Sequence, residues 1–304
     1  MRKRLSVITL ALLLSACGQS ESKAQSAPTP QLKPVQEIQA VVAHEIAKTP
    51  APKISCIGVL EQGGAVQCTT FPHAVLQVGS LKTKADENGI AIIGFDRDTP
   101  AKQKIIVVTR KGESFSKTLN IKSREFGVQR IDGLPPSQVS KFSDKALIRI
   151  RASSARKKTG FASRQKAMGF TDGFVLPVEG TKTSDFGNQR ILNGVPKRPH
   201  YGVDIAAPLG TPIYAPADGV ISLADNDLYF EGAMVLIDHG QGLISMYLHM
   251  SDIIVESGQS VKRGDKIGAV GAKGRATGPH LCWRLKWRNR NLDPELLTKW
   301  PRND

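Results

Sequence analysis

Three short segments of this chain carry side chains that bind metal ions or transfer protons. They contribute the pair His200-x-x-x-Asp204, then His249, and then the pair His280-x-Cys282. Imidazole, carboxylate and thiolate are donors that hold Zn²⁺ in proteins, and imidazole is also the commonest general base. Together the segments predict one metal ion with histidine bases beside it, a combination suited to hydrolysis.

The last of these segments, residues 280–287, alternates strictly between apolar and polar or ionisable side chains. In a β-strand, successive side chains point to opposite faces of the sheet. One face therefore meets the core, while the other places two donors where they can approach one metal ion. The apolar face holds Leu281, Trp283, Leu285 and Trp287, and the polar face holds His280, Cys282, Arg284 and Lys286. This predicts Cys282 outside the core, although a free cysteine is most often a buried, inert thiol.

The segment around His249 shows the same alternation. It predicts Tyr247 and His249 on one face, opposite the apolar side chains of Met246, Leu248 and Met250. A lone histidine on a strand is more often structural, but a second strand with the same segregation favours a functional role.

The elements that must position these segments are mostly short strands. Residues 174–298 are rich in glycine, with apolar runs between tight turns, which predicts an antiparallel β domain. Residues 54–122 contain four runs of branched side chains separated by turn signals, which favours a smaller β-sandwich of immunoglobulin type. The expected fold class is therefore mainly β.

Between these two regions, residues 123–173 are predicted to form a basic helical linker. Its helix is expected over about residues 137–168, with Ser143 and Asp144 as a candidate start. The simpler interpretation of its many basic side chains is a solvated face. The alternative is electrostatic docking to wall polymer through Arg156, Lys157 and Lys158.

The N-terminal residues 1–16 have the composition of a signal peptide, with basic residues before an apolar run too short to span a bilayer. The run ends in Leu14-Ser-Ala-Cys17, which resembles the lipobox of bacterial lipoproteins. That resemblance implies cleavage before Cys17 and acylation of its thiol, so that the exported chain is anchored to a membrane and faces the periplasm. A signal peptide cut elsewhere is the alternative. Residues 17–53, rich in Ala, Pro, Gln and Ser, are expected to be a flexible tether.

The formal net charge is +15, and it is +12 without Arg2, Lys3 and Arg4 of the signal peptide. Such a charge favours anionic partners. For an exported lipoprotein these are carboxylates of the cell wall, and nucleic acid is not expected. In an oxidising compartment Cys56 and Cys68 can pair as a disulfide, which leaves Cys282 as the remaining thiol.

Residues 176–294 resemble the lysostaphin-type (LytM-like) zinc endopeptidases, which cut peptidoglycan. The resemblance covers a whole domain and includes the segments described above. Its motifs are Ser184-Asp-Phe-Gly187, His200-x-x-x-Asp204, residues 210–219, Asp238-His-Gly240, Tyr247-x-His249, residues 261–268 and Thr277-Gly-Pro-His280.

The resemblance implies a groove on an antiparallel sheet and a single Zn²⁺ held by His200 and Asp204. It also implies that His249 and His280 act on the attacking water and on the oxyanion, with Tyr247 able to add a hydrogen bond. The family's third ligand is a histidine, and here Cys282 stands in its place. Thiolate also binds zinc, but a second anionic ligand leaves the metal less positive and predicts lower activity.

The predicted function is zinc-dependent hydrolysis of the peptide cross-bridges or stem peptides of peptidoglycan. Which of the two histidines is the base stays open. The alternative is a catalytically weak LytM-like scaffold that activates a cell-wall amidase, since some relatives of this family have lost ligands and serve that purpose. Zinc content of the purified protein distinguishes the two.

Overall fold

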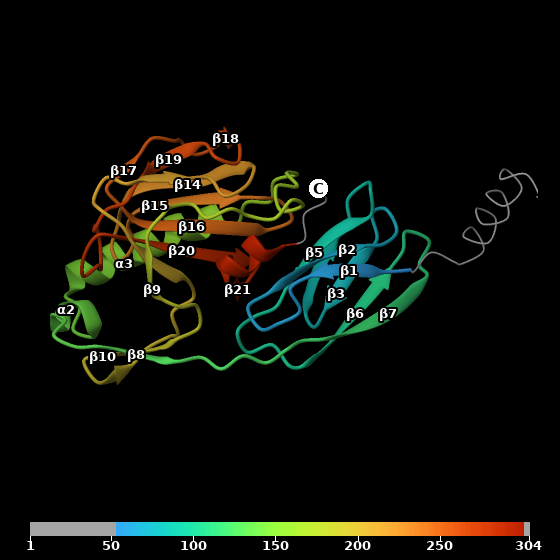
Figure 1. The fold of residues 1–304 in the computed structure, drawn as a ribbon, viewed down its shortest axis with the longest axis horizontal. Helices are drawn as coiled ribbons and strands as arrows, with labels where there is room; N and C mark the ends of the chain where they lie inside the picture. Colours follow the sequence, from blue (N-terminus) through green and yellow to red (C-terminus); the bar gives the residue numbers. More distant parts are fainter. Residues whose placement is uncertain (1–52, 301–304) are drawn as a thin grey trace, which may run out of the picture. The chain divides into compact units, whose positions relative to one another are not determined.

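The computed structural model describes residues 53–300 (Figure 1). The expected signal peptide, the expected acylation site at Cys17 and the expected tether up to residue 52 lie outside the described residues. Within residues 53–300, no helix is both long and apolar enough to cross a membrane. The described chain is built mainly from antiparallel sheets with one long helix, which confirms the mainly β prediction.

The region predicted as a sandwich forms two small antiparallel sheets. The first contains β1 (Ser55–Gly58), β2 (Ala65–Thr69) and β5 (Ile90–Gly94). The second, in the order β4-β3-β6-β7, contains β3 (Val75–Val78), β4 (Leu81–Lys84), β6 (Lys102–Val108) and β7 (Ser114–Asn120). Cys56 and Cys68 lie directly opposite each other on β1 and β2, and a disulfide joins them.

The linker contributes a strand and two helices. Strand β8 (Val128–Ile131) was not expected, and it pairs in parallel with β10 (Gln189–Leu192). Helix α2 (Pro136–Val139) is one turn long, and α3 runs over Asp144–Phe161. The start of α3 agrees with the sequence signal, because the hydroxyl of Ser143 accepts a hydrogen bond from the backbone N–H of Ala146 at 3.2 Å.

Helix α3 is shorter than the expected span of residues 137–168. Beyond Phe161 the chain leaves the helix, and the backbone N–H of Gln165 donates to Asp238 Oδ2 at 2.9 Å. Tertiary pairing with the large sheet therefore ends the helix, although local composition would permit more turns.

One large antiparallel sheet carries the predicted site segments. Its strands, in spatial order, are β18 (Ser260–Val261), β14 (Gly219–Leu228), β15 (Gly232–Asp238), β16 (Leu243–Met250), β20 (His280–Trp287), β12 (Val203–Ala206) and β9 (Thr181–Ser184). Strand β21 (Arg290–Leu292) adds to β20. One small sheet contains β13 (Pro212–Tyr214), β19 (Lys266–Ala269) and β17 (Asp252–Ile253). A second small sheet contains β11 (Val195–Pro196), β10 and β8. The 3₁₀-helix η1 covers Pro294–Lys299.

The large sheet is buried on both faces. One face supplies the main core, where Leu281, Trp283, Leu285 and Trp287 are each 0% exposed, as predicted from the alternation in β20. The other face carries a second apolar cluster that includes Met246, Leu248 and also Cys282. Cys282 thus lies on the predicted face, away from the main core, but it is 1% exposed and belongs to this second apolar cluster, so the prediction that it lies outside the core is wrong.

Helix α3 packs against this second face. Gly160 allows the close approach, because a Cβ atom there would lie 2.8 Å from Leu236 Cδ1. Two of the basic side chains considered for wall docking, Arg156 and Lys157, form ion pairs with Asp225 and Glu231 instead. Part of the basic face therefore secures the helix to the sheet.

Candidate metal centre and active site

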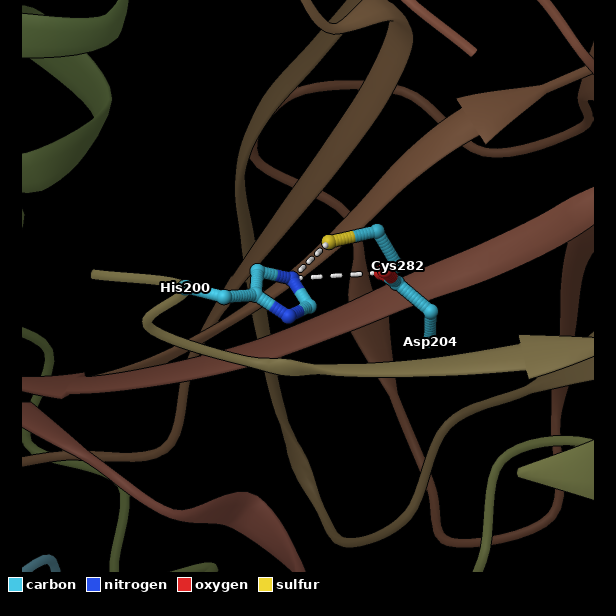
Figure 2. Close-up of side chains that lie close together, drawn as sticks. All are labelled: His200, Asp204 and Cys282. Atoms are coloured by element: carbon cyan, nitrogen blue, oxygen red, sulfur yellow. Dashed lines mark hydrogen bonds and ion pairs between the residues drawn. The ribbon is translucent and has the colours of Figure 1, made fainter. Parts of the chain in front are cut away.

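The fold brings His200, Asp204 and Cys282 together (Figure 2). Strands β12 and β20 pair so that Asp204 lies directly opposite Cys282, and His200 enters from the loop before β12. His200 Nε2 lies 3.2 Å from Asp204 Oδ1 and 3.3 Å from Cys282 Sγ. All three residues are buried, and their donor atoms lie within 4.8 Å of one another.

These separations fit a tetrahedral metal ion. With zinc–nitrogen and zinc–oxygen bonds of about 2.05 Å and a zinc–sulfur bond of about 2.3 Å, donors lie about 3.3 Å (N to O) and about 3.5 Å (N to S) apart. The observed 3.2 and 3.3 Å differ from these values by only about 0.2 Å. In addition, Asp204 Oδ1 is buried and has no hydrogen-bond partner among the described residues. A cation at this point would satisfy that oxygen, so the residues present fit a bound metal.

The tautomer of His200 is also fixed for metal binding. Gln129 Oε1 accepts from Arg190 Nε at 3.0 Å, because a guanidinium can only donate. The single proton of the Ser184 hydroxyl is then directed to the same Gln129 oxygen at 3.3 Å. Ser184 Oγ therefore accepts from His200 Nδ1, 3.0 Å away, and His200 Nε2 keeps its lone pair for the metal.

Two arginines that sequence reasoning did not assign to the site contact the anionic donors. Arg190 Nη2 lies 2.9 Å from Asp204 Oδ2, and Arg284 Nε lies 3.2 Å from Cys282 Sγ. Arg284 could be placed on the polar face of β20 by alternation, but no sequence signal linked Arg190 to Asp204. The positive charge expected to be lost through the cysteine ligand is thus partly restored by these neighbours.

Burial and charge act together on the pKa values of the three donors. Burial lowers the pKa of His200 to about 4, so its imidazole is neutral at pH 7. Burial would raise the pKa of Asp204, but His200 and Arg190 outweigh it and hold that pKa well below its usual range. Burial raises the pKa of the Cys282 thiol to about 12, and Arg284 opposes this shift. A coordinated metal would remove the thiol proton outright.

His249 and His280 lie beside the three donors. They line a cavity of about 390 Å³ together with Asp204 and Cys282. The two rings are 4.8 Å apart, and His280 Nε2 lies 3.9 Å from Asp204 Oδ1. Each Nδ1 lies 2.8 Å from a backbone carbonyl oxygen, that of Lys273 for His249 and that of Gly278 for His280. Both Nε2 atoms are therefore available for proton transfer.

The position of His249 depends on an irregularity in β16. Against β15, Leu248 pairs with Met234 and Met250 pairs with Ala233, so His249 is the extra residue of a β-bulge, and its φ is +66°. The bulge breaks the period of two. His249 consequently reaches the site although Leu248, its neighbour, lies on the same face as Cys282.

The expectation that Tyr247 joins the site is therefore wrong. Tyr247 is 0% exposed in the main core on the opposite face of the sheet. Its hydroxyl lies 2.8 Å from Ser245 Oγ, and that oxygen lies 2.7 Å from His239 Nε2. Burial raises the pKa of Tyr247 above its usual value. Tyr247 has a structural role in the core.

Comparison with known proteins agrees with this geometry. Residues 198–294 match the model of Peptidase family M23. The chain is 46% identical over 113 residues to the peptidoglycan DD-endopeptidase ShyA of Vibrio cholerae, covering 36% of this chain and 26% of that protein. It is 31% identical over 213 residues to ShyB of the same species, also a peptidoglycan DD-endopeptidase, covering 70% of this chain and 45% of ShyB. The chain thus matches less than half the length of these relatives.

A crystal structure from Pseudomonas aeruginosa, described as a peptidase M23, shares the fold with a TM-score of 0.62 and 29% identity. The match covers 79% of this chain and 96% of that one. Because the match extends beyond residues 198–294, the two structures also share elements outside the segment that matches the family model. The chain therefore carries a domain of peptidase family M23.

Proposed function

We propose that this chain is a zinc-dependent endopeptidase that hydrolyses peptide cross-bridges or stem peptides of peptidoglycan. The observation that carries the proposal is the clustering of the donors His200, Asp204 and Cys282 beside a cavity that His249 and His280 line together with Asp204 and Cys282. The relatives named as peptidoglycan DD-endopeptidases support the choice of substrate.

In this proposal His200, Asp204 and Cys282 hold the metal. When bound, the zinc ion polarises the scissile carbonyl group and lowers the pKa of a water molecule. Arg190 and Arg284 hold the carboxylate and the sulfur in place through the contacts described above. Their charges also keep the centre electropositive, which favours the negative charge that develops on the carbonyl oxygen.

His249 and His280 carry the proton transfers. Burial lowers the pKa of His249 to about 4, so this imidazole is neutral at pH 7 and able to accept a proton at Nε2. With the rings 4.8 Å apart, one histidine accepts the proton of the attacking water and then passes it to the leaving amine, while the other donates a hydrogen bond to the carbonyl oxygen as negative charge develops there.

We further propose that the chain acts outside the cytoplasm and is held at a membrane by lipid on Cys17. The disulfide between Cys56 and Cys68 supports an oxidising compartment. Labelling with a radioactive fatty acid tests the anchor, because label should enter the unaltered chain and be absent after Cys17→Ala.

Digestion of purified sacculi tests the activity. The full-length chain should release soluble muropeptides whose masses correspond to cut peptide bonds, and a chelator should stop the release until zinc is restored. A His280→Ala variant provides the matched inactive protein. If the unaltered chain bound no zinc and released nothing, but stimulated a cell-wall amidase, the scaffold alternative would replace this proposal.

A further inference from the structure

A second cavity, of about 520 Å³, adjoins the metal centre. It shares Arg190, Leu192, His249 and Arg275 with the cavity that contains the catalytic histidines. Its walls come from helix α3, from residues 197–201 and from strands β16 and β20. A ligand group in this second cavity would therefore lie directly beside the reacting centre.

The lining of the second cavity is strongly basic. Glu231 is its one carboxylate, against seven basic side chains, which are Lys157, Arg190, Lys197, Arg198, Arg275, Arg284 and Lys286. Lys157 is neutralised by Glu231, and Arg190 by Asp204. Among residues 53–300, Arg198, Arg284 and Lys286 form no ion pair with a carboxylate within 4.0 Å.

Carboxylates of the described residues compensate only part of the positive charge of the cavity. Burial, followed by the charges of Arg190 and Arg284, lowers the pKa of Arg275. Burial likewise lowers the pKa of Lys286, whose ammonium group lies 5.1 Å from the centre of the Phe161 ring. Like charges in a partly buried space repel one another, and an anion among them would relieve that repulsion.

The remaining lining indicates what else the ligand carries. Glu231 Oε2 is buried and has no hydrogen-bond partner among the described residues, so it can accept from an amide N–H. Met234, Met246 and Leu248 supply an apolar part of the lining. A peptide with a free carboxylate combines a negative charge, an N–H donor and a small apolar portion, and so matches this lining.

We propose that this second cavity binds a free carboxylate of the peptide substrate, next to the bond that is cut. The inference rests on the proposed endopeptidase function and defines its substrate class. Peptides that keep this carboxylate are preferred over peptides in which it is amidated, and Arg198 and Lys286 contribute to the preference without contacting the metal ligands.

Binding to the metal-free full-length chain tests the inference. The probes are N-acetyl-D-alanyl-D-alanine and its C-terminal amide, which differ only in the charge of one end. Calorimetric titration should show the acid binding about tenfold more tightly than the amide. The double variant Arg198→Gln/Lys286→Gln should reduce this ratio to about twofold, and Arg198→Lys/Lys286→Arg should restore it. The control Arg110→Gln/Lys111→Gln removes the same charges from an exposed turn and should keep the full ratio.

Equal affinity of the unaltered chain for acid and amide would overturn the inference. A tenfold ratio that is unchanged in Arg198→Gln/Lys286→Gln would also overturn it. So would a preference for the acid that appears only after zinc is added and is unchanged in the same double variant, because the metal would then be the binding group. Circular dichroism confirms that the variants are folded. Because these titrations need neither metal nor turnover, a chain that binds the acid but digests no sacculi would refute only the proposed function.

Discussion

Replacing Cys282 with alanine should weaken zinc binding by about a hundredfold. Structural zinc sites have binding free energies of roughly 10–16 kcal/mol over four ligands, so one ligand accounts for about 3 kcal/mol, and about 1.4 kcal/mol is a factor of ten. The estimate applies here because Sγ already lies within about 0.2 Å of the distance from His200 Nε2 that a tetrahedral zinc requires.

Competition with a chromophoric chelator at pH 7 measures the dissociation constant. Cys282→Ser provides a control of nearly the same volume, because a hydroxyl group fills the space but binds zinc weakly. Cys282→His should keep zinc and retain or raise activity, since imidazole is the ligand that the resemblance implies. Replacement of zinc by cobalt adds a spectroscopic readout, because a sulfur-to-cobalt charge-transfer band should be present only in the unaltered chain. Unchanged zinc affinity in Cys282→Ala would show that the sulfur is not a ligand and would refute the donor set.

Three further predictions follow from the same structure. His249→Asn, which tolerates the positive φ of the bulge, should lower the rate of sacculus digestion by about 10²–10⁴-fold with unchanged zinc content, and normal digestion would exclude His249 from proton transfer. Gly160→Val should destabilise the chain by about 1–3 kcal/mol, because its side chain would collide with Leu236, whereas Ala152→Val on the exposed side of the same helix should leave the melting temperature within about 2 °C. Burial lowers the pKa of His239 to about 4 in the folded chain. Between about pH 4 and the usual histidine pKa of about 6.5, the unfolded chain therefore binds more protons than the folded chain. The free energy of unfolding should consequently fall as the pH drops from about 6.5 to 4. His239→Gln should flatten this pH dependence in denaturant titrations.

Regular alternation made part of the site predictable from the sequence. In β20 the pairing with β12 and β16 is unbroken, so the period of two placed the four core side chains on one face and His280 with Cys282 on the other. The motifs of the lysostaphin-type resemblance supplied His200 and Asp204 as candidate ligands, and the structure brings them together with Cys282.

The alternation of side chains failed as a guide in β16, because the extra residue of the bulge at His249 moves every later side chain of the strand to the opposite face. The sequence around His249 carries no signal for a bulge, because a positive φ is usually adopted by glycine and not by histidine. The burial of Cys282 could not be predicted from local sequence either, because it depends on its contact with His200 and on apolar side chains of neighbouring strands. The contacts of Gln129 and Arg190 arise from a parallel pair of strands more than fifty residues apart, which no local pattern reveals.

The pairing of β8 with β10 shows that residues upstream of the family match contribute to the candidate site. Residues 198–294 suffice for recognition of the family, but Gln129 lies far upstream and fixes the proton on His200 through Ser184. A fragment trimmed to the family match would lose Gln129 and Ser184, the Arg190 partner of Asp204 and one wall of the cavity that His249 and His280 line. Expression of such a fragment would yield a domain that is recognisable by its sequence yet lacks the contacts that orient the candidate metal ligands.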